Sequence, residues 1–140
     1  MTTDERLYWV SGKKKRVLVI DDDPELLQLV RVLLARINAE AVTTDNATTA
    51  AALLRSGAAP DLMILDLMLP EVSGVEFLRQ LRADPAYAQL PVIVLSALVD
   101  PDRIRAALEA GADRYLTKPY IANNLLTVVS EILRVGRRQE

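Results

Sequence analysis

Short apolar runs alternate with amphipathic segments along the chain, and the spacing of the apolar positions predicts which element each stretch forms. Apolar runs of strand length predict strands at 16–20, 62–65 and 91–95, and weaker segments at 41–44 and 113–117 complete a set of five. Apolar residues recurring every three or four positions predict five helices, at 24–37, 47–55, 74–84, 101–111 and 121–135. Strands that alternate in this way with helices favour an α/β fold with right-handed crossovers and a parallel sheet covered on both faces.

The order of the strands and the extent of the domain follow from this pattern. We expect the strand order 2-1-3-4-5, with the weak second strand near an edge and a crevice between the first and third strands. The 140 residues suit one domain. We divide them into an N-terminal extension over 1–15, a domain over 16–136 and a short tail over 137–140. The basic run at 13–16 is expected to be a solvated lead-in to the first strand rather than a nucleic-acid patch.

Composition narrows the chemistry. With 17 Lys and Arg against 19 Asp and Glu, the formal net charge is −2, which does not favour binding to nucleic acid or to an anionic membrane. The absence of cysteine excludes disulfides and thiolate chemistry and fits a cytoplasmic protein. The absence of histidine excludes an imidazole-based triad and a typical zinc site. No apolar run approaches the roughly 18 residues of a membrane helix. We therefore expect a cytoplasmic protein without direct contact to membrane or nucleic acid.

Chemically reactive side chains follow the predicted strands at their carboxyl ends. Asp21 and Asp22 follow the first strand, Asp66 ends the third, Ser96 follows the fourth and Lys118 follows the fifth. In an open parallel sheet, ligands bind outside this edge, so these residues are expected to converge. Taken singly, Asp66 could cap a turn and Lys118 could be a solvated lysine.

Three carboxylates meeting in one crevice cannot all stay ionised without positive charge. A hard divalent ion with oxygen ligands, such as Mg²⁺, would supply it. Together with Lys118 and the Ser96 hydroxyl, the ion would form an electrostatic cradle for an anionic phosphoryl group.

Four motifs in order make the chain resemble the receiver domain of two-component response regulators, a single-domain, chemotaxis-receiver-like type with a flavodoxin-like doubly wound fold. They lie at 17–22, at 60–70 with Gly74, at 91–97 and at 111–119, and the resemblance covers about 16–135. It implies a phosphoprotein of phosphorelay signal transduction that catalyses only its own phosphorylation and dephosphorylation. A sensor histidine kinase or a histidine phosphotransfer protein would be its partner, together with a downstream protein target.

The resemblance also implies roles for single residues. Asp66 would be the phosphoacceptor and Lys118 would bind a phosphoryl oxygen. Mg²⁺ would be held by Asp22 directly, by Asp21 largely through water, by Asp66 and by the backbone carbonyl of Met68. The peptide bond between Lys118 and Pro119 would be cis.

Ser96 and Tyr115 would act as the switch. Ser96 would move to hydrogen-bond the phosphoryl group and Tyr115 would swing inward behind it, which is a population shift between two packings. A face formed by 101–110, the strand of Tyr115 and 121–135 would contact partners, and a homodimer there is possible. Met68 and Leu98, two residues beyond Asp66 and Ser96, are both apolar, so we expect slow self-dephosphorylation.

Four functions remain open at this point. The leading one is a stand-alone receiver that signals through protein contact. The others are a phosphorelay intermediate that passes its phosphoryl group to another protein's histidine, and a receiver module of a longer regulator. A flavodoxin-like nucleotide binder is disfavoured because no glycine-rich phosphate loop follows the first strand.

Overall fold

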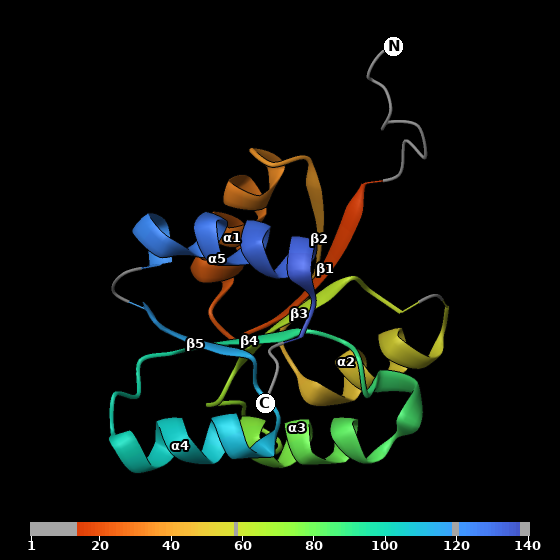
Figure 1. Cartoon of the computed structure of the whole chain (residues 1–140), viewed down its shortest axis with the longest axis vertical. Coiled ribbons are helices and arrows are strands. Elements are labelled where there is room, and N and C mark those ends of the chain that lie inside the picture. The colour runs from red at the N-terminus through yellow and green to blue at the C-terminus, as the bar shows by residue number, and fades with distance from the viewer. Residues whose placement is uncertain (1–13, 58, 119–120, 138–140) are drawn as a thin grey trace.

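A five-stranded parallel sheet of order β2-β1-β3-β4-β5 runs through the middle of the computed structural model, with helices on both faces (Figure 1). The structure describes residues 14–57, 59–118 and 121–137. The elements in chain order are β1 Lys15–Ile20, α1 Pro24–Ala35, β2 Ala39–Thr44, α2 Ala47–Arg55, β3 Leu62–Asp66, α3 Gly74–Ala83, the 3₁₀ turn η2 Pro85–Tyr87, β4 Val92–Ser96, α4 Pro101–Ala110, β5 Arg114–Thr117 and α5 Ile121–Val135. The predicted fold class and strand order are confirmed.

Polar side chains start the helices where the sequence places them. Asp23 caps α1 by accepting a hydrogen bond from the backbone N–H of Glu25, and a proline follows it at the first helical position. Asp100 begins α4 in the same way. Each of these helices therefore starts directly after the carboxyl edge of the sheet, which places the preceding loop residues near one another.

The turn between α1 and β2 differs from the prediction. The helix ends at Ala35 and not at Ile37, because Asn38 adopts the left-handed conformation with φ of 57° and turns the chain tightly. Ile37 still packs against the core, which explains why the apolar periodicity continues past the helix. The strand then begins at Ala39 rather than at 41, where Ala39 is buried beside Lys15 of β1.

Two apolar clusters hold the layers together. Helices α1 and α5 cover one face of the sheet, and α2, α3 and α4 cover the other (Figure 1). Every residue of β3 and β4 is buried, whereas β2 and β5 at the edges are partly exposed. Asp66, the last residue of β3, is thus supported by a strand that is packed on both faces.

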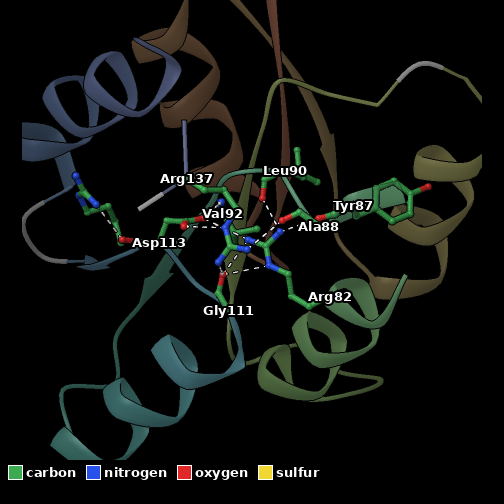
Figure 2. A network of polar contacts seen from close by, with 9 residues as sticks. Arg82, Tyr87, Ala88, Leu90, Val92, Gly111, Asp113 and Arg137 are labelled. Atoms are coloured by element: carbon green, nitrogen blue, oxygen red, sulfur yellow. Dashed lines mark hydrogen bonds and ion pairs between the residues drawn. The ribbon is translucent and has the colours of Figure 1, made fainter. Parts of the chain in front are cut away.

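At the amino edge of β4 and β5, a buried cluster of charged side chains links Asp113 to Arg82 and Arg137 (Figure 2). The carboxylate of Asp113 is fully buried, and Arg82 of α3 lies 3.3 Å from one of its oxygens. Arg137, just beyond α5, donates to the other oxygen at 3.0 Å, and the backbone N–H of Val92 donates to the carboxylate at 2.9 Å. Both guanidinium groups also donate to the carbonyl of Gly111.

The two arginines also satisfy carbonyls that follow α3. Arg82 donates to the carbonyls of Tyr87 and Leu90, and Arg137 donates to that of Ala88. Burial, and next the neighbouring charge of Arg137, lower the pKa of Arg82 to about 10, so the group remains a cation at neutral pH. The cluster fixes α3, the turn before β5 and the segment after α5 against one another.

Some sequence-based expectations lie outside the described residues. These are the N-terminal extension up to residue 13, the cis bond at Pro119 and residues 138–140 of the expected tail. Among the described residues, no helix combines the length and the apolar character that crossing a membrane requires.

Candidate functional site

The carboxyl edge of the sheet brings together the side chains that the sequence singled out. Asp21 follows β1, Asp66 ends β3 and Lys118 follows β5. Asp21 is 1% exposed and Asp66 is 2% exposed, so two carboxylates are buried side by side at neighbouring strand ends. Such burial costs free energy unless positive charge compensates it.

Lys118 supplies part of that charge. Its ammonium nitrogen lies 3.1 Å from Oδ2 of Asp21 and 3.1 Å from Oδ2 of Asp66. Burial by itself lowers the pKa of Lys118, but the close contacts with the Asp21 and Asp66 carboxylates and their negative charges outweigh it, so the pKa is raised overall. The group therefore stays protonated and bridges the two acids.

Asp21 remains incompletely compensated. Burial has the largest effect on the pKa of Asp21 and raises it, and the negative charge of Asp66 raises it further. The hydrogen bond from the backbone N–H of Asp23 and the contact with Lys118 lower it, but the pKa is raised overall. Oδ2 of Asp21 is buried and accepts no well-aligned hydrogen bond from the described residues, although the Lys118 ammonium lies close to it. A buried oxygen of this kind is suited to a cation.

A divalent cation fits the remaining charge. Asp21, Asp22 and Asp66 each offer one carboxylate oxygen, and these three atoms lie within 4.8 Å of one another. Asp22 is exposed, which leaves the cluster open to solvent on one side. Three carboxylates against one ammonium leave a local charge that a hard, oxygen-liganded ion such as Mg²⁺ would neutralise while keeping some of its water. The residues present therefore fit the ion.

The loop after β3 keeps Asp66 in place. Oδ1 of Asp66 accepts a 3.1 Å hydrogen bond from the backbone N–H of Met68, while Oδ2 faces Lys118. The N–H of Gly74 donates to the carbonyl of Leu67 at 2.8 Å, which draws the start of α3 against the end of β3. A Cβ at Gly74 would lie 2.5 Å from Cα of Leu67 and 2.6 Å from the carbonyl oxygen of Asp66, so glycine is required at this position.

Ser96 and Tyr115 meet at one loop residue. Ser96 ends β4, is fully buried and accepts a 3.1 Å hydrogen bond from the backbone N–H of Leu98. The hydroxyl of Tyr115, on β5, donates to the carbonyl of Leu98 at 2.6 Å. The strand register places Leu95, the residue before Ser96, beside Asp66. The two expected switch residues are thus connected through the loop between β4 and α4.

The residues two positions beyond Asp66 and Ser96 bring no polar side chain to the site. The Met68 side chain is largely exposed, and Leu98 is half-buried. Both are apolar, as the sequence indicated.

Glu71 is a polar residue to which the sequence analysis gave no role. Its carboxylate accepts hydrogen bonds from the backbone N–H groups of Ala47 and Thr48, at 2.9 Å and 3.1 Å, and from the Thr48 hydroxyl at 2.9 Å. The three bonds tie the loop between β3 and α3 to the amino end of α2. Local sequence carries no signal for this contact, because the partners are 23 and 24 residues apart.

Comparison with known proteins places these features in a family. The family model described as the response regulator receiver domain matches residues 17–130. The phosphate regulon transcriptional regulatory protein PhoB of Pseudomonas aeruginosa is 34% identical over 120 residues, which cover 86% of this chain and 52% of that protein. The transcriptional regulatory protein KdpE of Mycobacterium tuberculosis is 42% identical over 120 residues, which cover 84% of this chain and 50% of that protein.

A solved structure of a response regulator has a similar fold. The chemotaxis response regulator CheY4 of Vibrio cholerae superposes with a TM-score of 0.79 at 25% identity, covering 86% of this chain and 99% of that one. The chain therefore spans about half the length of the two transcriptional regulators but nearly all of the chemotaxis protein.

Proposed function

The chain belongs to the response regulator receiver domain family, and on that premise we propose that Asp66 accepts a phosphoryl group from the phosphohistidine of a partner kinase. In the transfer, a carboxylate oxygen of Asp66 forms a bond to phosphorus while the bond between phosphorus and the imidazole nitrogen breaks. The electron pair of that bond stays on the departing imidazole. This chain contains no histidine, so the donor belongs to a different protein.

The observation that carries this proposal is the position of Lys118 between two buried carboxylates. Its ammonium group contacts both Asp21 and Asp66 at 3.1 Å, so a cation already lies beside the carboxylate that would receive the phosphoryl group. A preorganised cation lowers the energy of the charge that develops during transfer. After transfer, the same ammonium would bind a phosphoryl oxygen.

A magnesium ion at the acidic cluster would complete the charge balance. Asp22 would bind it directly, Asp21 largely through water, and Asp66 and the Met68 carbonyl would be the remaining protein ligands. When bound, Mg²⁺ screens the repulsion between the carboxylates and the incoming phosphoryl oxygens. The close ligand oxygens of the three aspartates and the buried Oδ2 of Asp21 support this assignment.

The response to phosphorylation is proposed to pass through Ser96 and Tyr115. The Ser96 hydroxyl accepts from the Leu98 N–H, so its own proton is free to be donated to the phosphoryl group, and a movement of Ser96 toward that group would shift the loop at Leu98, to which Tyr115 is also bonded. Tyr115 would then turn inward. Helix α4, strand β5 and helix α5 would present the altered surface to a downstream protein or to a second copy of the chain. We place these events in the cytoplasm, in keeping with a sequence that contains no cysteine.

Intact-mass measurement tests the proposal. The protein is incubated with Mg²⁺ and acetyl phosphate, and we expect the mass of one added phosphoryl group, which hydroxylamine removes because it cleaves acyl phosphates. Asp66→Asn should give no adduct, and an excess of EDTA should suppress the adduct in the native protein. Asp84→Asn, which changes an exposed aspartate that follows α3, should be modified like the native protein. An adduct that persists in Asp66→Asn would overturn the assignment.

A second candidate is that the chain acts as the receiver module of a longer transcriptional regulator. The roughly half-length coverage of PhoB and KdpE favours it. DNA binding would then reside in residues beyond the matched region, and the expected absence of nucleic-acid contact would apply to these 140 residues alone. Reading the natural open reading frame beyond Glu140 distinguishes this candidate from a stand-alone receiver.

A further inference from the structure

The amino end of α2 is capped by residues from two distant parts of the chain. Asn46 accepts a 2.7 Å hydrogen bond from the backbone N–H of Thr49. Glu71 accepts from the two preceding N–H groups, those of Ala47 and Thr48. The first N–H groups of a helix have no partner within the helix, so these contacts satisfy all three. The carboxylate also lies at the positive end of the helix dipole.

The hydrogen bonds that Glu71 accepts favour its ionised form. Its second oxygen accepts from the Thr48 hydroxyl, so both carboxylate oxygens are engaged by α2. The hydrogen bonds from the Thr48 backbone and hydroxyl lower the pKa of Glu71. The carboxylate oxygens that cluster at the candidate metal site come from Asp21, Asp22 and Asp66, and Glu71 is not part of this cluster. Its carboxylate is therefore directed to the helix and away from the role of a metal ligand.

The loop that carries Glu71 also carries the Met68 carbonyl. At its start, the Met68 N–H is bonded to Asp66, and at its end Gly74 is bonded to Leu67. Between these anchored ends, Glu71 ties the middle of the loop to α2. A shallow hollow of about 460 Å³ is lined by Asp22 and by residues 67–73, so the loop forms one wall beside an expected metal ligand. The position of the loop over 67–73 therefore depends on the contact between Glu71 and α2.

We propose that Glu71 is a positioning residue for the metal site: by fastening the loop after β3 to α2, it holds the Met68 carbonyl where a bound Mg²⁺ requires it. The inference rests on the proposed function, because it assumes that the acidic cluster binds Mg²⁺. Hydrogen-bond acceptance by the Glu71 side chain is what matters, and its negative charge is not needed. Outer residues that orient metal ligands commonly change metal affinity by about 10- to 100-fold when they are removed.

Calorimetric titration of the full chain with Mg²⁺ separates geometry from charge. Glu71→Ala removes the acceptors, and we expect the dissociation constant for Mg²⁺ to rise about tenfold. Glu71→Gln keeps an acceptor for the two N–H groups, and its amide can donate to the Thr48 hydroxyl, so its dissociation constant should stay within about twofold of the native value. Thr48→Val, which removes only the hydroxyl contact, should fall between the two.

Glu76→Ala is the matched control. Glu76 lies in the first turn of α3 and its carboxylate contacts Arg79 and Gln80 of the same helix, so the variant loses the same charge without releasing the loop. Its Mg²⁺ affinity should be native. Circular dichroism without metal shows whether each variant is folded. If Glu71→Ala is not folded, the Mg²⁺ dissociation constants of the native protein, Glu71→Gln and Thr48→Val decide the proposal, and we expect them to rise in that order.

The possible outcomes are distinct. Native affinity in both Glu71→Ala and Thr48→Val would overturn the positioning role. Equal weakening in Glu71→Gln and Glu71→Ala would also overturn it, because charge would then be the cause. If the native protein binds no Mg²⁺ at millimolar concentration, the metal site of the proposed function fails, and the positioning role fails with it.

Discussion

The ammonium nitrogen of Lys118 lies 3.1 Å from Oδ2 of Asp66, although 52 residues separate them in the sequence. The contact joins the end of the central strand β3 to the end of the edge strand β5. It gives the buried carboxylate a permanent cationic neighbour before any phosphoryl donor or metal arrives. Electrostatic stabilisation that is built into the folded state needs no rearrangement during the reaction.

Replacing this cation should impair both reactivity and stability. We expect Lys118→Met to slow phosphorylation by acetyl phosphate about 10²-fold, the scale on which single preorganised donors act. The free energy of unfolding should fall by about 1–2 kcal/mol, less than for a fully buried pair, because the Lys118 side chain is 25% exposed. Phosphorylation is followed by intact mass and stability by urea unfolding. Lys14→Met, at an exposed lysine before β1, is the control and should behave as the native protein does.

Asp21→Asn should stabilise the metal-free protein at neutral pH. Because the folded-state pKa of Asp21 is raised, its stabilising contribution is present below the ordinary aspartate pKa and is lost as the pH rises through the folded-state value. The asparagine variant lacks this loss, so its melting temperature in EDTA should exceed that of the native protein at pH 7 and approach it in acid. Added Mg²⁺ should raise the melting temperature of the native protein more than that of the variant. A lower melting temperature of the variant in EDTA at pH 7 would contradict this account.

Gly74→Ala should damage the site through the backbone. The added methyl would meet the Leu67 Cα and the Asp66 carbonyl, neither of which can move without shifting the end of β3. We expect a loss of about 1–3 kcal/mol in unfolding free energy, as for other overpacked positions, and slower phosphorylation. Gly57→Ala is the matched control, since nothing lies within 4 Å of a Cβ there. Similar stabilities of the two variants would show that the close approach at Gly74 is not limiting.

The Asp113 cluster should determine stability without affecting the site. Asp113→Asn would leave two arginines without their anionic partner, and we expect a loss of about 3–5 kcal/mol. Arg137→Ala should cost about 1 kcal/mol, because its side chain is 24% exposed and Arg82 still pairs with Asp113. Calorimetric Mg²⁺ affinity, measured well below the melting temperature, should be native in Arg137→Ala. A changed affinity would show that the two edges of the sheet are coupled.

The lifetime of the acyl phosphate should depend on two apolar side chains. Neither Met68 nor Leu98 can orient a water molecule, so we expect slow hydrolysis in the native protein. The double variant Met68→Asn, Leu98→Glu should lose its phosphoryl group several-fold faster after the donor is removed, as followed by intact mass. An unchanged or longer lifetime in the variant would refute the idea.

Convergence of the site was predictable because it follows from topology. Once the apolar runs are assigned to parallel strands, Asp21, Asp66 and Lys118 must lie at one edge, whatever the details of packing. The burial that raises the pKa of Asp21 follows from the same strands. The boundary errors near Ile37 arose because apolar periodicity reports burial, and a buried side chain can follow the last residue of a helix.

Contacts between surface loops were not predictable in this way. Glu71 reads as an ordinary loop residue, and its bonds to α2 depend on the exact spacing of two turns. Arg82 reads as a basic residue in the last turn of a helix, where it would face solvent, yet it points inward to Asp113. Hydropathy says nothing about which charged side chains find one another across the fold.

The contacts of Arg137 set a practical limit on shortening the protein. Helix α5 ends at Val135, so a version trimmed to the last helical residue would keep every helix and strand of the described residues. It would also lose a guanidinium group that holds Asp113 and the Gly111 carbonyl. Any fragment prepared for crystallisation or for fusion to another domain should therefore retain Arg137. A fusion junction placed before Arg137 would leave a receiver domain of lower stability.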